Sequence, residues 1–257
     1  MQTNHDYPDI AVRRKEHVAI VELCRPPHNY FDEALIRNLV ECFEQLDADP
    51  SCRAIVLASH GKAFCAGADF TGGQTDPQLP RRLYRHAVRL FRTRKPIVAA
   101  VHGPAIGGGV GLALVADFRV TCETARFAVN FNRLGIHPGF GLSVTLPRLI
   151  GAQQAAMLLF TGKRIDGRKA VEIGLADVLA PADEVLEHAV ALAEEIAASA
   201  PLALMSTRDT LRQGLADAVL AAVDREASEQ EWQVQTADFT EGVAATAARR
   251  TPVFQGK

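Results

Sequence analysis

The chain has 257 residues, of which 48% are hydrophobic and 23% charged, and its formal net charge is −2. This length suits one large domain or two small ones, with ample apolar material for a core. The near-neutral charge excludes the strongly basic surface expected of a nucleic-acid-binding protein or a protein of anionic membranes. No basic, apolar secretory signal opens the sequence, and the cysteines are scattered without a C-x-x-C pair, so we expect a cytoplasmic protein with reduced thiols and no metal site.

Apolar periodicity predicts a β-hairpin over Val12–Arg14 and His17–Leu23. Asp32 is expected to cap a helix whose apolar positions recur at helical spacing as far as Leu46. The elements that follow are predicted as a strand at Ala54–Ala58, a helix around Leu83–Phe91, and strands at Ile97–Val101 and Phe118–Thr121. This alternation predicts a largely parallel sheet with right-handed crossovers.

Beyond about Ser143 the pattern becomes helical. We expect helices over Gln153–Phe160, Ala182–Ala198, Leu202–Gln213 and Ala216–Gln235. The uncharged run from Ile97 to Ala116 has the length of a membrane span. However, it contains His102, Pro104 and several glycines, so a buried strand, a turn and a buried helix explain it better.

Two short segments, Lys62–Phe70 and Ala105–Leu114, carry the clearest functional signal. Each follows an apolar strand-like run and places Ala and Gly where the chain must turn sharply. Residues without bulk let another molecule approach the backbone, so that amide N–H groups make the contact. Two such turns facing one another would supply a pair of donors to a single oxygen, which is the geometry of an oxyanion hole. A helix expected from Gly108 to near Asp117 would point its free N–H groups at the same spot.

In this order and at this separation, the two segments resemble the crotonase (enoyl-CoA hydratase/isomerase) superfamily. The resemblance runs from Arg25-Pro26 to Phe254 and so covers nearly the whole chain. It implies an α/β fold: a crotonase-like spiral of ββα turns over residues 1–200 and a C-terminal helical trimerisation region over residues 201–257. It also implies a homotrimer or a homohexamer built as a pair of trimers.

Carried over residue by residue, the resemblance implies that the N–H groups of Ala66 and Gly108 form the oxyanion hole. They would hold the thioester carbonyl oxygen of an acyl-coenzyme A and stabilise an enolate-like anion. The coenzyme's adenine and pantetheine would lie beside the stretch Ala66, Gly67, Ala68 and Asp69, and Ala63 is also expected to bind substrate. Because coenzyme A is then part of the substrate, no separate cofactor is expected.

The sequence departs from the hydratase pattern at both acid–base positions. Hydratases of the family use two glutamates, and the matching positions here are Gly111 and Phe131. Neither residue can move a proton. Relatives that dehalogenate 4-chlorobenzoyl-CoA share the glycine and an aromatic residue nearby, but Gly139 stands where they carry a nucleophilic aspartate. We therefore expect Gly111 and Phe131 to bind substrate instead. The absence of a side chain at Gly111 would leave room for a bulky or aromatic acyl group.

His137 is the candidate base, because it lies in the loop after Phe131 and histidine suits proton transfer near neutral pH. A loop histidine bonded to backbone is the alternative. Tyr84, His86 and Arg81 lie on a helix from which some family members draw active-site groups.

Three functions stay open: an enzyme of the family, an acyl-CoA hydrolase or carbon–carbon bond enzyme using His137 with water, and a non-catalytic acyl-CoA-binding subunit. The glycine triplet Gly107–Gly109 would also suit a dinucleotide loop, but the G-x-G-x-x-G spacing is absent.

Overall fold

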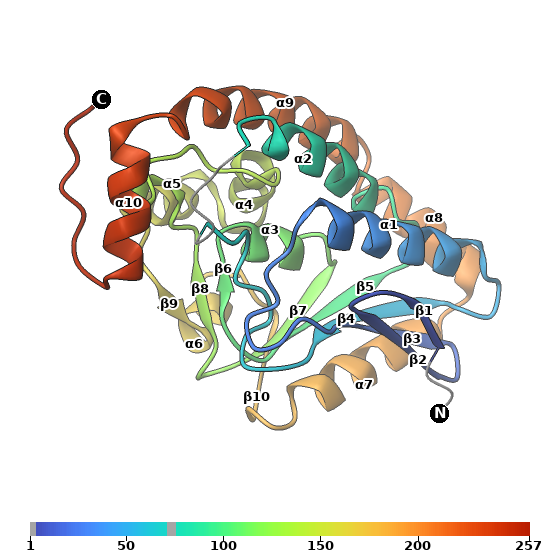
Figure 1. Ribbon diagram of the computed structural model, residues 1–257. Coiled ribbons are helices and arrows are strands. Elements are labelled where there is room, and N and C mark those ends of the chain that lie inside the picture. Colours follow the sequence, from blue (N-terminus) through green and yellow to red (C-terminus); the bar gives the residue numbers. More distant parts are fainter. Residues whose placement is uncertain (1–3, 71–75) are drawn as a thin grey trace.

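The computed structural model describes residues 4–70 and 76–257 as a mixed α/β fold with two sheets (Figure 1). The larger sheet has the strand order β1-β2-β3-β4-β5-β7-β10, and a small sheet has the order β6-β8-β9. The larger sheet comprises β1 (Asn4–Tyr7), β2 (Ile10–Lys15), β3 (Val18–Leu23), β4 (Ala54–Ser59), β5 (Ile97–Val101), β7 (Phe118–Cys122) and β10 (Val178–Ala180). The small sheet comprises β6 (Ala105–Ile106), β8 (Arg126–Ala128) and β9 (Ile165–Asp166).

The larger sheet begins as an antiparallel hairpin and continues as a parallel sheet. Strands β2 and β3 pair antiparallel, whereas β3, β4, β5, β7 and β10 pair parallel in that order. Every residue of β3 and β5 is buried. Parallel strands are buried in this way when helices cover both faces of a sheet. The predicted hairpin and parallel sheet are confirmed.

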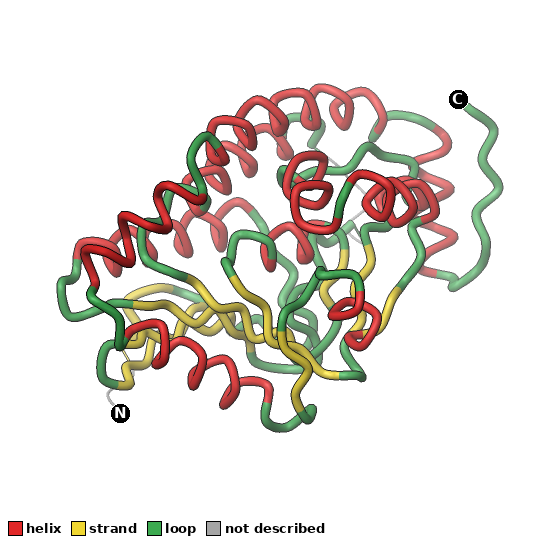
Figure 2. Tube along the Cα trace, turned by 180° about the vertical axis from the view of Figure 1, so that it is seen from behind, coloured by secondary structure: helices red, strands yellow, loops and turns green. Residues whose placement is uncertain are grey.

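Helices form a layer on each side of this sheet. The helix α7 (Val185–Ala197) packs against β3, β4, β5 and β7 on one face. On the other side lie α1 (Glu33–Ala48), α2 (Leu79–Leu90) and α9 (Leu215–Gln233), with α2 packed between α1 and α9. Figure 2 shows the sheet between these two layers.

Local sequence signals explain where several helices begin. The Asp32 carboxylate accepts a hydrogen bond from the Leu35 N–H at 2.8 Å, which caps α1 as predicted. Helix α2 starts four residues before the predicted Leu83, with Pro80 in its first turn, where proline needs no N–H donor. Helix α3 (Gly108–Ala113) begins at the predicted glycine but ends before the predicted Asp117.

The remaining helices fill the second half of the chain. They are α4 (Leu142–Ile150), α5 (Ala152–Thr161), α6 (Gly167–Glu172), α8 (Pro201–Leu211) and α10 (Ala237–Ala247). The four predicted helices correspond to α5, α7, α8 and α9, whereas α4, α6 and α10 were not predicted. Helix α8 begins at Pro201, at the start of the expected C-terminal region. The trimerisation role of residues 201–257 stays a prediction.

All five cysteines have free thiols, and four of them are buried. In the described part of the chain, no single helix is long and apolar enough to cross a membrane. The bent pair α7 and α8, with an angle of 107° between them, meets that criterion by length and composition only.

Candidate functional site

The two glycine turns lie side by side. Cys65 and Ala105 form a parallel β-bridge, and the Ile106 N–H donates to the Cys65 carbonyl at 3.0 Å. The Cys65 N–H in turn donates to the Pro104 carbonyl at 3.1 Å. The predicted juxtaposition of the two segments is therefore present.

Gly67 shows how closely the turns approach. It has a φ of +80°, and a Cβ atom there would lie 2.8 Å from the Ile106 carbonyl oxygen and 3.4 Å from the Gly108 nitrogen. Any side chain at position 67 would therefore be strained and would also push the turns apart. Glycine at this position brings the amide of Gly108 next to the first turn.

The amide of Ala66 is not free to bind a substrate. Its N–H donates to the His28 carbonyl oxygen at 3.0 Å, which differs from the role expected of it. By contrast, the N–H groups of Ala68 and Gly108 have no hydrogen-bond acceptor within residues 4–70 and 76–257. Ala68 and Gly108 therefore each bring an unpaired N–H donor to this site.

A cavity of about 370 Å³, named here the glycine-turn cavity, opens beside these donors. Of the residues expected to bind substrate, it is lined by Ala66, Gly67, Ala68, Asp69, Gly108 and Phe131. Its aromatic lining comprises Tyr30, Phe31, Phe70, Tyr84 and Phe131. Ala63 is not in the lining; its carbonyl oxygen accepts a hydrogen bond from the Asn29 side chain at 2.8 Å.

The titratable groups of this lining, within the described residues, are Tyr30, Asp69, Asp76, Tyr84 and Arg164. Partial burial, and then the negative charge of Asp69, raise the pKa of Tyr30. Neither a glutamate nor a histidine lines the cavity in the described part of the chain. Its carboxylates are those of Asp69 and Asp76.

Gly111 does not open room for a substrate, contrary to expectation. A Cβ atom at position 111 would lie 2.7 Å from the Phe140 Cβ, and Gly111 itself is buried outside the cavity lining. The Phe140 side chain is fully buried and contacts the rings of Phe31 and Tyr84, at centroid distances of 5.5 and 6.2 Å. Phe140 thus occupies the volume beside Gly111.

His137 lies outside the cavity lining, which argues against its expected role as base. Its ring Nδ1 is 2.7 Å from the Pro138 carbonyl oxygen. Its backbone is attached to α9: the N–H donates to the Gln233 side chain at 2.5 Å, and the carbonyl accepts from Gln230 Nε2 at 2.6 Å. The structure therefore agrees with a loop histidine bonded to backbone.

Sequence analysis points to Tyr84 but not to its partner Gln230. The Tyr84 hydroxyl donates to Gln230 Oε1 at 3.0 Å, and both residues line the cavity. Burial, and then the negative charge of Glu226, raise the pKa of Tyr84, so its hydroxyl stays protonated. Tyr84 lies on α2, as noted from the sequence, but only the packing of α2 on α9 reveals Gln230.

The other two candidates on α2, Arg81 and His86, lie beside carboxylates near the surface. Arg81 donates to the Glu231 carboxylate at 2.7 Å, and His86 Nε2 lies 3.6 Å from Glu33. Neither lines the cavity.

Glu226 fixes the loop that carries Phe140. Its carboxylate accepts from the Gly141 N–H at 2.8 Å, and from the Ser143 N–H and hydroxyl at 3.0 and 2.6 Å. Burial raises the pKa of Glu226, against the effect of the hydrogen bonds from Ser143 and Gly141. These bonds hold Phe140 in a backbone conformation with a φ of +61°.

In this α/β fold, two adjacent turns each present an unpaired backbone N–H group to one cavity. The family model for enoyl-CoA hydratase/isomerase matches residues 13–257. The chain therefore belongs to the enoyl-CoA hydratase/isomerase family, a family of enzymes. This confirms the resemblance to the crotonase superfamily.

Curated relatives match over nearly their full lengths. The chain is 38% identical to a putative enoyl-CoA hydratase of Thermus thermophilus, across 93% of this chain and 98% of the relative. It is 34% identical to the 2,3-dehydroadipyl-CoA hydratase of Escherichia coli, across 97% of this chain and 99% of that enzyme.

Solved structures show the same fold. An enoyl-CoA hydratase/isomerase from Pseudoalteromonas atlantica superposes with a TM-score of 0.86 at 28% identity, covering 96% of this chain and all of the other. An enoyl-CoA hydratase/isomerase from Mycobacterium paratuberculosis gives a TM-score of 0.83 at 33% identity, covering 93% of this chain and 99% of the other. The expected fold class is thus confirmed.

Proposed function

We propose that this protein is an acyl-CoA enzyme that holds the thioester carbonyl oxygen between the N–H groups of Ala68 and Gly108. The observation that carries the proposal is the pair of unpaired amides on two turns in direct contact, at the edge of one cavity. Backbone donors fixed in this way stabilise negative charge that develops on an oxygen during reaction. The names of the relatives, which include coenzyme A thioester hydratases, supply the class of ligand.

The proposed reaction proceeds through an enolate-like anion without a pair of glutamates. Gly111 and Phe131 stand at the expected glutamate positions, and Phe140 packs where a side chain on residue 111 would extend. The aromatic lining favours a bulky or aromatic acyl group, because ring edges and faces pack well against other rings. Asp69 is the carboxylate nearest in sequence to the donor of Ala68.

A second candidate is an acyl-CoA-binding subunit without turnover. It is favoured by the cavity lining, which in the described residues holds neither glutamate nor histidine. For either candidate we propose a homotrimer or a pair of trimers in the cytoplasm, with residues 201–257 forming the contacts between subunits.

Calorimetry with acetyl-CoA, crotonyl-CoA and benzoyl-CoA tests the proposal. We expect submillimolar binding, with benzoyl-CoA the tightest. If none of the three binds below millimolar concentration, the proposed ligand class is wrong. Turnover of the same thioesters, followed by mass spectrometry, separates the enzyme from the binding subunit.

A further inference from the structure

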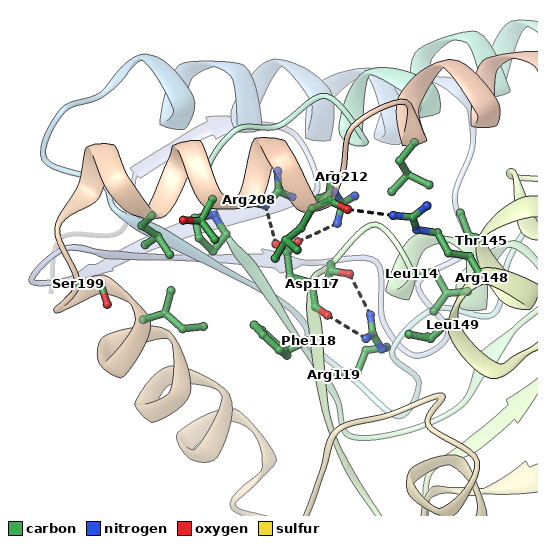
Figure 3. A pocket seen from close by; sticks show the side chains of 17 residues that line it. Leu114, Asp117, Phe118, Arg119, Thr145, Arg148, Leu149, Ser199, Arg208 and Arg212 are labelled. Carbon is green, nitrogen blue, oxygen red and sulfur yellow. Dashed lines mark hydrogen bonds and ion pairs between the residues drawn. The ribbon is translucent and has the colours of Figure 1, made fainter.

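The glycine-turn cavity and a second cavity, of about 470 Å³, differ in where their linings come from. The second cavity lies between α8, α4 and the start of β7, where Arg208 and Arg212 converge on Asp117 (Figure 3). Part of its lining belongs to residues 201–257, for which contacts between subunits are proposed above. The glycine-turn cavity takes most of its lining from residues before 201, so most of its surface lies outside that region.

Asn130 lies beside the turn that presents the Gly108 N–H. The small sheet brings the two segments together: Ile106 of β6 pairs with Ala128 of β8, and the Gly107 N–H donates to the Ala128 carbonyl at 2.7 Å. Gly108 and Asn130 each follow two residues after this pair. A Cβ atom on Gly107 would lie 3.9 Å from Asn130 Oδ1. The Asn130 carboxamide is therefore close to one of the two donors of the proposed oxyanion hole.

The Asn130 side chain lines the glycine-turn cavity, is half-buried, and has an unpaired carboxamide. It precedes the short 3₁₀ helix Phe131–Arg133 without capping it, and no group within residues 4–70 and 76–257 forms a hydrogen bond with its amide atoms. Gln230, a second carboxamide of the lining, has protein partners at both polar atoms. Its Oε1 accepts from the Tyr84 hydroxyl at 3.0 Å, and its Nε2 donates to the His137 carbonyl at 2.6 Å. The hydrogen-bonding capacity of Asn130 is thus left for a ligand.

The chemistry of a carboxamide indicates which ligand group it would bind. A primary amide carries no charge, and it offers N–H donors on one atom and an acceptor on the other. A hydroxyl group can donate as well as accept, so it matches either atom of the carboxamide. With the thioester oxygen held at Gly108, the nearest carbon of the acyl group that can carry a hydroxyl is the α-carbon. A hydroxyl there would pair an amide that an unsubstituted acyl group leaves without a partner.

We propose that Asn130 is a specificity-determining residue that binds the hydroxyl group of a 2-hydroxyacyl-CoA thioester. This role depends on the function proposed above, because the thioester oxygen must lie between the N–H groups of Ala68 and Gly108. The rest of the acyl group would pack against the aromatic lining, which includes Phe131, whose Cζ would lie 3.7 Å from a Cβ on Gly107. The acyl group is thus recognised by a neutral hydrogen-bonding group beside the donors and by aromatic rings around it.

Calorimetry of the full-length protein with 3-phenylpropanoyl-CoA and with both enantiomers of its 2-hydroxy and 3-hydroxy derivatives tests the proposal. One enantiomer of the 2-hydroxy derivative should bind about tenfold more tightly than the unsubstituted thioester. Asn130→Leu removes both polar atoms, so this preference should vanish while the unsubstituted thioester binds as before. Asn132→Leu, at an exposed position outside the lining, is the matched control and should keep the full preference.

The outcomes distinguish a wrong role for Asn130 from a wrong ligand class. If none of these thioesters binds below millimolar concentration, the proposed function is wrong, and the role of Asn130 with it. If they bind but the 2-hydroxy group adds no affinity, or the 3-hydroxy group adds more, the ligand class stands and the role of Asn130 is wrong. A preference that survives in Asn130→Leu, or that is lost equally in Asn132→Leu, also overturns this role.

Discussion

Gly111 and Phe140 occupy one volume between them: a Cβ on Gly111 would lie 2.7 Å from the Phe140 Cβ and 2.8 Å from its Cδ1. The missing side chain on α3 is thus matched by a large one from the loop before α4. Phe140 also contacts Phe31, whose ring would lie 2.4 Å from a Cβ on Gly108. The packing behind the proposed oxyanion hole therefore depends on this pair.

Gly111→Ala should lower the free energy of unfolding by about 1–3 kcal/mol, because the added methyl group overpacks the site. In Gly111→Ala/Phe140→Ala the loss should be smaller than the sum of the two single losses, since each change makes room for the other. Urea denaturation of the four proteins measures this double-mutant cycle. Strict additivity would contradict the contact as described.

Crotonyl-CoA hydration should be very slow or absent. Each missing acid–base group typically costs a factor of about 10²–10⁴ in rate. The double variant Gly111→Glu/Phe131→Glu should not gain hydratase activity, because Phe140 blocks the side chain at 111. Loss of the crotonyl-CoA absorbance near neutral pH is the assay, and efficient hydration by the unaltered protein would refute the expectation.

Ala68→Pro removes one proposed donor and should lower turnover of an accepted thioester by about 10²–10³. Ala68→Gly keeps the N–H and is the matched control. Isotope-edited infrared difference spectra of a ¹³C-labelled thioester carbonyl report the hydrogen bonds directly: the band should move less in Ala68→Pro than in the control. If the band position in Ala68→Pro is the same as in the control, then the carbonyl oxygen accepts its hydrogen bond from another amide.

His137→Gln should leave turnover and acyl-CoA affinity close to those of the unaltered protein. The ring lies outside the glycine-turn cavity, and the backbone bonds to Gln230 and Gln233 do not depend on it. Steady-state kinetics over a range of pH is the measurement. A large loss of kcat with unchanged affinity would restore His137 as the base.

Periodicity was enough to predict much of the fold. The hairpin, the parallel strands and the α1 cap follow from alternation and from a single aspartate, all of which are local signals. The small sheet was missed because strands of two or three residues carry no period. Helix α10 was missed although Thr236 caps it, accepting from the Phe239 N–H at 3.1 Å.

The site was predictable only as far as its two turns. The Ala66 N–H is paired because it donates to the carbonyl oxygen of His28, a residue on a loop distant in sequence. The side-chain volume at Gly111 depends on Phe140, and the placement of His137 depends on α9. These contacts join residues far apart in sequence, so no local pattern reports them.

The C-terminal tail should loosen in acid through Glu241. Its carboxylate accepts from Arg250 Nη1 and Nη2 at 2.5 and 2.7 Å and from the Val253 N–H at 2.7 Å. The hydrogen bond from Arg250, followed by that from Val253, lowers the pKa of Glu241 from 4.5 to about 2. Because the folded state holds this proton less tightly than the unfolded state, the stabilisation is fully present above the unfolded pKa and is lost as pH falls toward the folded value.

Melting temperatures of the unaltered protein and of Glu241→Gln, measured from pH 7 down to the onset of acid unfolding, test this sign. The difference between them should be constant above about pH 5 and should shrink below it, because the carboxylate of the unaltered protein becomes protonated there. The effect should be small, since the pair lies at the surface and solvent screens it. Glu41→Gln, at an exposed position of α1 without an ion pair in the described residues, is the control and should show no such trend. A difference that grows as pH falls would mean that Glu241 stabilises the tail in its protonated form, contrary to the geometry of its three donors.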